Sequence, residues 1–220
     1  MLRDNEKTTS YSHIVRTLSN QVFRYPRVRT YILTVPKDKI LSTFGGIMYK
    51  INTKAEDVYL VDINPTNLKS ILQWYNSEEF RYATGIEGDV AIYQLAQMYN
   101  KAEQSENHFW TGIFISSTGE MIGVLKGQIK KESQVSIWIN TLIIDKTYQN
   151  KGYGTKTVNL LISYTKLKSN VSRVYIAVSD RNTRGYKFWG SLGFEHFGRV
   201  DNCIRFGEEV SNAIIMYKSV

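Results

Sequence analysis

The sequence lacks several features that would place it in specialised classes of protein. Its 220 residues include one cysteine, Cys203, which excludes a disulfide within the chain, and three histidines that are scattered rather than spaced for metal binding. No apolar run approaches the roughly 20 residues that a membrane-spanning helix requires. Charged and polar residues fill the first positions, where a signal peptide has an apolar stretch. We therefore expect a cytoplasmic protein with neither a metal nor a membrane partner.

The chain is strongly basic, but it also lacks the usual signatures of nucleic-acid binding. It carries 28 lysines and arginines against 20 aspartates and glutamates, a net charge of +8. It has no zinc-finger spacing, no aromatic RNA-binding signature and no long basic tract. Several cations instead surround one glycine-containing loop: Lys146, Lys151, Lys156, Arg181, Arg184 and Lys187. This placement indicates an anionic ligand at the loop and argues against nucleic acid as the partner.

That loop joins a predicted buried strand to a predicted helix within residues 136–166. Residues 137–144 are almost all apolar and rich in β-branched side chains, which is typical of a strand buried on both faces. Beyond Gly154, the apolar residues Val158, Leu161 and Ile162 recur at helical spacing. The first turn of a helix leaves backbone N–H groups without partners, and its dipole favours an anion there. Residues 149–155 therefore form a candidate cradle for phosphate, with an ordinary strand-to-helix turn as the alternative.

Two short motifs distinguish among the phosphate-binding families. The loop has neither the Gly-x-x-x-x-Gly-Lys-[Ser/Thr] pattern of Walker A nor a good match to the Rossmann fingerprint. QNKGYG at residues 149–154 instead resembles the Gln/Arg-x-x-Gly-x-Gly/Ala pyrophosphate loop of the GNAT superfamily of acyl-CoA-dependent N-acyltransferases. Further along, NTRGYKFWGSLGF at residues 182–194 resembles the Asn-x-x-Ala-x-x-Phe-Tyr-x-x-x-Gly-Phe signature of that family. From the order and spacing of both motifs, the chain is identified as a member of this superfamily.

The resemblance implies a mixed α/β fold over residues 56–220, with a central mixed β-sheet flanked by helices. Residues 1–55 fall outside it and are expected to form a small N-terminal α/β extension of unknown role, because they hold too many apolar residues for disorder. In the extension the patterns predict a helix at 10–24, strands at 28–35 and 47–51, a short helix after Pro36, and a polar join at 52–56. In the domain they predict strands at 57–63, 109–116, 121–129, 135–144, 171–178, 194–200 and 212–220, and helices at 64–75, 90–100, after Gly154 and at 182–192. Residues 77–89 are expected to form a loop.

The resemblance further implies transfer of an acetyl group from acetyl-CoA, bound as the acyl-donor co-substrate, to a primary amine by direct attack. The cofactor-binding residues that it implies are Gln149, Asn150, Lys151, Gly152, Tyr153, Gly154 and Thr155 in the loop, with Asn182 and Lys187 in the second motif. In the family, backbone N–H groups at the bulged end of the central strand contact the thioester, and this position maps to Leu142, Ile143 and Ile144. The Leu142 backbone would stabilise the oxyanion, and the strands would separate just beyond this residue.

The residues that usually move protons in this family are missing. A free alkyl amine with a pKa near ~10 must lose a proton before it attacks. Some members place a glutamate on the central strand, where this chain has Trp138, and many place a tyrosine in the second motif, where it has Trp189. Tyr186 lies one helical turn earlier and is the first candidate acid, with Tyr153 and Tyr148 as weaker candidates and a purely structural aromatic side chain as the alternative. The candidate bases are Glu79, Glu87, Asp89 and ordered water.

The acceptor is left open by the sequence. Residues 77–89 correspond to the acceptor-lining region of the family, and their acidic side chains favour a cationic acceptor. A polyamine, an amino acid, an antibiotic and a protein amine are all candidates, and the protein is expected to be a monomer or a homodimer. Two other functions remain open. The missing glutamate and tyrosine favour an acyl-CoA-binding sensor without turnover, and the basic charge favours a protein that interacts with nucleic acid or the translation apparatus.

Overall fold

The computed structural model describes residues 48–220, so the helices predicted at 10–24 and after Pro36 and the strand at 28–35 lie outside the described residues. The prediction of a strand up to residue 51 and a polar join at 52–56 is wrong. Residues 48–51 are not in a strand, whereas β1 (Asn52–Lys54) pairs with β2 (Val58–Asp62). Ile51 is fully buried, and its N–H donates to Asp62 Oδ1 at 3.0 Å. Residues 48–54 thus pack with the domain, whose compact unit spans Ile47–Val220.

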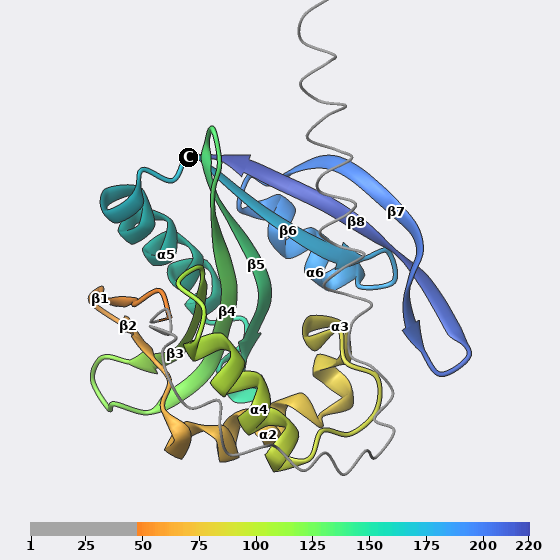
Figure 1. Ribbon diagram of the computed structural model, residues 1–220, viewed down its shortest axis with the longest axis horizontal. Coiled ribbons are helices and arrows are strands. Elements are labelled where there is room, and N and C mark those ends of the chain that lie inside the picture. Colours follow the sequence, from red (N-terminus) through yellow and green to blue (C-terminus); the bar gives the residue numbers. More distant parts are fainter. Residues whose placement is uncertain (1–47) are drawn as a thin grey trace, which may run out of the picture. The chain divides into compact units, whose positions relative to one another are not determined.

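The described strands form one mixed sheet in the order β1-β2-β3-β4-β5-β6-β8-β7 (Figure 1). After β1 and β2 come β3 (His108–Ile115), β4 (Met121–Lys131), β5 (Val135–Ile144), β6 (Arg173–Ser179), β7 (Glu195–Phe206) and β8 (Glu209–Ser219). Neighbouring strands are antiparallel except β5 and β6, which run parallel and therefore need a crossover, supplied by α5 (Tyr153–Ser169). The predicted mixed α/β fold with a central sheet is confirmed.

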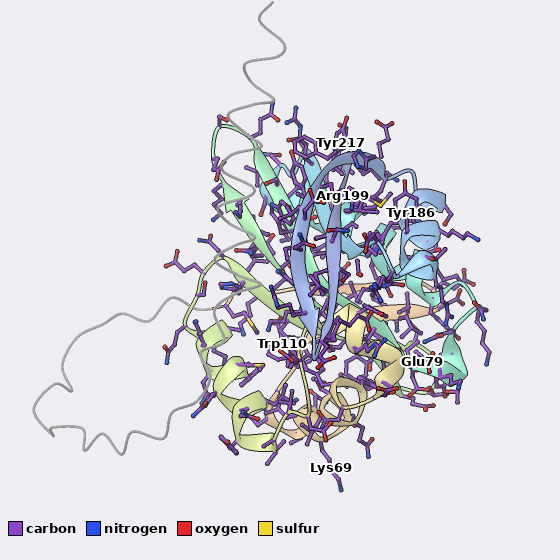
Figure 2. All side chains as sticks on the ribbon, turned by 90° about the vertical axis from the view of Figure 1, so that its right-hand side faces the viewer. Lys69, Glu79, Trp110, Tyr186, Arg199 and Tyr217 are labelled. Carbon is purple, nitrogen blue, oxygen red and sulfur yellow. The ribbon has the colours of Figure 1, made fainter. Side chains whose placement is uncertain are left out.

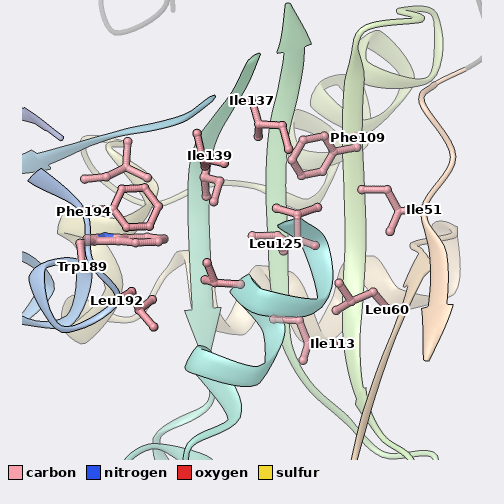
Figure 3. Packing of buried hydrophobic residues seen from close by; sticks show 14 of the residues in the cluster. Ile51, Leu60, Phe109, Ile113, Leu125, Ile137, Ile139, Trp189, Leu192 and Phe194 are labelled. Carbon is pink, nitrogen blue, oxygen red and sulfur yellow. The ribbon is translucent and has the colours of Figure 1, made fainter. Parts of the chain in front are cut away.

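Helices cover both faces of the sheet, and each face has its own hydrophobic core. On one face α5 and α6 (Thr183–Ser191) bury Val158, Leu161 and Trp189 against the sheet residues Ile137 and Leu125 (Figure 3). On the other face α2 (Leu68–Tyr75) and α4 (Ile92–Glu103) pack over a second cluster that includes buried sheet residues. Strand β5 is therefore buried on both sides, as its apolar run predicted.

Short helical turns add to the longer helices, one within a predicted helix and the others in stretches that were expected to be loops. η1 (Pro65–Asn67) begins where the Asn64 side chain accepts the Thr66 N–H at 2.9 Å, and it leads into α2. η2 (Glu78–Phe80) and α3 (Arg81–Thr84) lie in the stretch that was expected to be only a loop. η3 (Lys146–Tyr148) precedes α5. At the C-terminal end, β7 continues past the predicted limit at residue 200 and forms a long hairpin with β8.

The sheet opens between its two parallel strands. Strands β5 and β6 pair from Ser136 with Arg173 to Ile139 with Ile176, and no further. At the next position Asn140 forms a bulge, because Ile139 and Thr141 pair with consecutive residues of β4. The expectation that the strands separate just beyond Leu142 is wrong, since the separation begins three positions earlier at this bulge. The second half of β5 therefore has β4 on one side and a gap on the other.

Candidate active site

The gap between β5 and β6 opens into a cleft of about 420 Å³. Its walls come from α3 and η2 on one side, the ends of β5 and β6, the loop before α5, and α6. The described residues that line it are Glu79, Phe80, Tyr82, Ala83, Ile139, Asn140, Thr141, Leu142, Ile144, Tyr148, Gln149, Asn150, Gly152, Gly154, Thr155, Ile176, Ala177, Val178, Asn182, Arg184, Gly185, Phe188 and Trp189. Both motifs of the sequence therefore meet at one cavity.

The backbone of β5 presents unpaired groups to this cleft. The Asp145 N–H donates to the Ile122 carbonyl of β4 at 2.7 Å. Because backbone groups alternate in direction along an antiparallel strand, Ile143 also faces β4, whereas Leu142 and Ile144 face the gap. The carbonyl of Ile144 is on that side, where it accepts Gln149 Nε2 at 2.8 Å. The Leu142 N–H therefore points into the cleft, where β6 no longer pairs with it.

The N-terminus of α5 opens onto the same cleft. Gly152 precedes the helix with φ of 83°, a left-handed conformation that favours glycine. The first intrahelical bond runs from the Lys156 N–H to the Gly152 carbonyl, so the N–H groups of residues 153–155 have no partner within the helix. A Cβ added at Gly152 would meet no atom within 4 Å, whereas one at Gly154 would lie 3.2 Å from the Phe188 ring. Gly152 thus leaves room for a ligand, and Gly154 lets α5 pack closely on α6.

Charged side chains link the two walls of the cleft near the loop that precedes α5. Glu79 lies 3.9 Å from Lys146 Nζ and 3.7 Å from Arg184 Nη1. Arg184 also donates to the Gln149 side chain. The carboxylate of Glu79 is therefore shared by two cations, and Arg184 connects α6 with both the opposite wall and the phosphate-cradle loop.

A second charged network borders the cleft at the other end. Glu209, at the start of β8, accepts the Tyr82 hydroxyl at 2.8 Å and lies 3.0 Å from Arg181 and 3.5 Å from Arg81. The Tyr82 hydrogen bond is the largest factor that holds the pKa of Glu209 below its ordinary value, and it outweighs the effect of burial. Tyr82 also packs edge-on against Phe206, with ring centres 5.3 Å apart. The tip of the β7–β8 hairpin thus fixes Tyr82 in the cleft wall.

Helix α6 does not present Tyr186, predicted as the catalytic acid, among the described residues that line the cleft. The cleft is lined by Asn182, Gly185, Phe188 and Trp189, which share one face of the helix. Tyr186 follows Gly185 by one residue, about 100° around the axis, and its side chain is 38% exposed. Tyr186 on α6 and Glu79 on the opposite side of the cleft are both labelled in Figure 2. Asn182 caps α6 by accepting the Gly185 N–H at 2.8 Å, so it also has a structural role.

The structure brings together most, but not all, of the predicted site residues. Those that line the cleft are Glu79, Leu142, Ile144, Gln149, Asn150, Gly152, Gly154, Thr155 and Asn182. The others are Glu87, Ile143, Lys151, Tyr153, Tyr186 and Lys187, and none of their side chains is among the described lining residues. Glu87, predicted as a candidate base, is exposed and accepts the Gly207 N–H at 2.9 Å. Ile143 is buried in the core beneath α2 and α4, and Lys151 and Lys187 are exposed to solvent.

Several lining residues were not predicted from the sequence. Asn140 is a polar residue that interrupts the apolar run of β5, a signal that could have located the bulge. Phe80 and Ala83 lie in the 77–89 stretch that was expected to line the acceptor site, but they were not singled out, because only tertiary packing brings α3 to the end of β5. Thr141 lies in β5 itself and was not singled out either. Among residues 48–220 no group of three or more His, Cys, Asp or Glu side chains could hold a metal ion. No helix in this part of the chain is both long and apolar enough to cross a membrane.

Comparison with known proteins identifies the class. A family model described as "Acetyltransferase (GNAT) domain" matches residues 60–214, and the chain belongs to this family. It is similar to a probable spermine N(1)-acetyltransferase of Bacillus subtilis subsp. natto, with 23% identity over 45% of this chain and 68% of that protein. The spermine/spermidine N(1)-acetyltransferase of Bacillus subtilis matches with 22% identity over the same shares of the two chains. The resemblance found in the two sequence motifs is confirmed.

Solved structures share the fold. The spermidine N-acetyltransferase of Vibrio cholerae, in complex with CoA and spermine, superposes with a TM-score of 0.67 at 17% identity, over 75% of this chain and 96% of that chain. An acetyltransferase of Salmonella typhimurium that modifies the N-terminal serine of ribosomal protein L7/L12 gives a TM-score of 0.65 at 12% identity. The match covers 76% of this chain and 96% of that chain. The protein is thus an acetyltransferase of the GNAT type, as its sequence predicted.

Proposed function

We propose that this protein transfers an acetyl group from acetyl-CoA to a primary amine within the cleft between β5 and β6. The observation that carries the proposal is that two sets of unpaired backbone N–H groups face one cavity. The N-terminus of α5 offers donors and a favourable dipole for the pyrophosphate. The Leu142 N–H, on the strand β5 that precedes α5, suits the carbonyl oxygen of the thioester. Relatives and structural neighbours named as acting on spermine, spermidine and an N-terminal serine are consistent with an amine acceptor.

The arrangement supports direct attack by the amine. The amine nitrogen adds to the thioester carbon, negative charge develops on the carbonyl oxygen near the Leu142 N–H, and the C–S bond then breaks. Glu79 is the acidic residue among the described lining residues, but its two carboxylate oxygens face Lys146 and Arg184 rather than a substrate amine. Water in the cleft therefore takes the proton that the amine must lose. Tyr82 and Tyr148 are the tyrosines of the described lining, and this position favours them over Tyr186 as groups that protonate the leaving thiolate.

The proposal is tested by following thiol release from acetyl-CoA with a panel of primary amines, together with the mass of the acetylated product. Amine-dependent thiol release with matching acetylation supports it. Binding of acetyl-CoA with no turnover for any amine would instead indicate an acyl-CoA sensor, and binding of neither would remove the cleft as a cofactor site.

The acetyl donor site can be tested with a matched pair of variants. Gly152 and Gly119 both have positive φ, 83° and 72°, but Gly119 lies in the β3–β4 turn and is not among the described lining residues. Gly152→Val places a side chain where the ligand is proposed to lie and should weaken acetyl-CoA binding by about tenfold or more. Gly119→Val imposes a similar backbone strain and should leave binding unchanged.

A further inference from the structure

We propose that the acceptor is a monoamine whose nitrogen is attached to an uncharged, partly apolar body, and that it is not a polyamine. This inference rests on the proposed acetyl transfer and names the substrate class of the same site. It follows from the distribution of charge around the cleft, because a polyamine carries several ammonium groups that each need an acidic partner or water.

The lining itself offers little negative charge. Glu79 is the acidic side chain among the described lining residues, and both of its oxygens already face cations, Lys146 at 3.9 Å and Arg184 at 3.7 Å. At the other end, the Glu209 carboxylate is shared by Arg81, Arg181 and the Tyr82 hydroxyl. The Glu79 carboxylate thus lies between two cations, and the Glu209 carboxylate lies between two others, one of which, Arg81, also pairs with the exposed Glu78. Neither is free to pair with a second ammonium of the substrate.

An additional positive charge lies behind the wall of the cleft. Lys126 of β4 pairs across the sheet with Thr141, a residue that lines the cavity. Its ammonium group contacts the Trp110 ring at 4.2 Å and makes no hydrogen bond or ion pair within the described part of the chain. Because this charge lies on the strand next to the cleft wall, it disfavours a second positive charge in the cleft.

The acidic residues that first suggested a cationic acceptor lie elsewhere. Glu78 is 96% exposed and pairs with Arg81, and Asp89 is exposed. Glu87 is exposed and accepts the Gly207 N–H. None of these three is among the described lining residues, so a substrate nitrogen within the cleft would not contact them.

The walls suit a different acceptor. Phe80, Tyr82 and Trp189 provide aromatic surface, and Ala83 adds a small apolar side chain. Asn140 and Thr141 provide neutral polar groups near the bulge of β5. An acceptor with one amine next to an apolar group would bury that group here without leaving a charge unpaired. A small arylalkylamine and the free α-amine of an uncharged peptide share this chemistry.

The test compares acceptors with the full-length protein and acetyl-CoA. Initial rates give kcat/KM for 2-phenylethylamine, for an uncharged peptide amide with a free α-amine, and for spermine and spermidine. We expect at least one monoamine to exceed both polyamines by about tenfold or more, with a smaller difference at high salt. The two monoamine arms distinguish a small molecule from a peptide. Higher kcat/KM for either polyamine overturns the inference while leaving acetyl transfer intact.

Substitution of Lys126 separates the electrostatic argument from simple shape. Lys126→Met keeps most of the side-chain length and removes the charge, so the ratio of monoamine to spermine kcat/KM should fall several-fold. Lys69→Met removes an exposed charge on α2 and should leave the ratio unchanged. A ratio that Lys126→Met does not alter overturns the electrostatic basis. Absence of thiol release with every amine overturns the proposed transfer itself, and the inference with it.

Discussion

The clearest energetic prediction concerns Lys126, whose charge is held in an unfavourable place. Its ammonium lies 4.2 Å from the Trp110 ring, and Trp110 is fully buried. Burial, with a smaller contribution from Lys101, lowers the pKa of Lys126 from its ordinary value of 10.5 to about 8. At pH 7 the side chain is therefore charged in the folded protein, at a cost in stability. Replacing it with an uncharged side chain of similar length should stabilise the fold.

The size of the effect follows from two opposing contributions. A pKa difference between 10.5 and about 8 corresponds to about 3 kcal/mol. The contact of the ammonium with the Trp110 ring stabilises the folded protein by on the order of 1 kcal/mol, and this stabilisation is lost when the charge is removed. Because desolvation outweighs the ring contact, Lys126→Met should raise the free energy of unfolding by about 2 kcal/mol at pH 7.

The dependence on pH distinguishes this cause from a general packing effect. Below pH 8 both the folded and the unfolded states carry the proton, and the full cost applies. Between pH 8 and 10.5 the unfolded state binds more protons than the folded state, so the wild-type protein gains stability as the pH rises. The advantage of Lys126→Met should therefore shrink between pH 7 and pH 10. Urea unfolding midpoints at constant m-value give the difference in free energy of unfolding between variant and wild type at pH 7 and at pH 10. The exposed Lys69→Met is the control. A variant less stable than wild type at pH 7, or an advantage that does not change with pH, would refute the reasoning.

Three further predictions address the site and its supports. Gly152→Val should weaken acetyl-CoA binding by about tenfold or more in calorimetry while Gly119→Val does not, and equal effects would remove the phosphate cradle. Glu209→Ala should raise the KM for the amine several-fold without changing acetyl-CoA affinity, and Glu209→Gln, which still accepts the Tyr82 hydroxyl, should recover part of the loss; an unchanged KM would contradict the positioning role. Asp145→Ala removes the acceptor of the Trp74 Nε1–H at 2.9 Å and should cost about 1–3 kcal/mol in urea unfolding. Burial raises the pKa of Asp145, but hydrogen bonds from Trp74 and Thr147 hold it lower overall, so this difference should persist at neutral pH and fade as the pH falls through that lowered pKa.

Most elements of the fold could be predicted because local patterns determine them. The apolar run of β5, the helical spacing after Gly154 and the Asn64 cap each depend on residues close in sequence. The short strand β1 could not be predicted, because its exposed residues lack the alternation of a strand and it forms only by pairing with β2. The length of the β7–β8 hairpin could not be predicted either, because the shifts in register between its strands interrupt the alternation of buried and exposed residues.

The cofactor half of the site was more predictable than the acceptor half for the same reason. The proposed phosphate cradle is one continuous segment, and the backbone conformation at Gly152 can be predicted from that segment alone. The acceptor wall instead depends on contacts such as Tyr82 with Glu209, which are 127 positions apart. The sequence did not predict that Tyr186 would lie outside the described lining, because spacing alone does not fix which face of α6 packs inward. That choice is made by Trp189, which is buried against Phe194 with ring centres 5.0 Å apart.

The two tryptophans at the positions of the missing acid and base have different environments. Trp138 is buried and stacks on Tyr175 at 5.1 Å between ring centres, so it strengthens the sheet rather than facing the described cleft. Trp189 does line the cleft and contributes apolar surface. Apolar side chains with structural roles thus occupy the two positions where the family usually has its base and its acid. For this reason we propose that water takes the proton from the amine.

The most direct test of the central claim is a calorimetric titration of the full-length protein with acetyl-CoA, with NAD as a control ligand. We predict saturable binding of acetyl-CoA, no binding of NAD, and loss of most of the acetyl-CoA affinity in Gly152→Val. Absence of acetyl-CoA binding to the wild-type protein would contradict it, because the N-terminus of α5 and the Leu142 N–H would then face the cleft without the ligand that their geometry is proposed to serve.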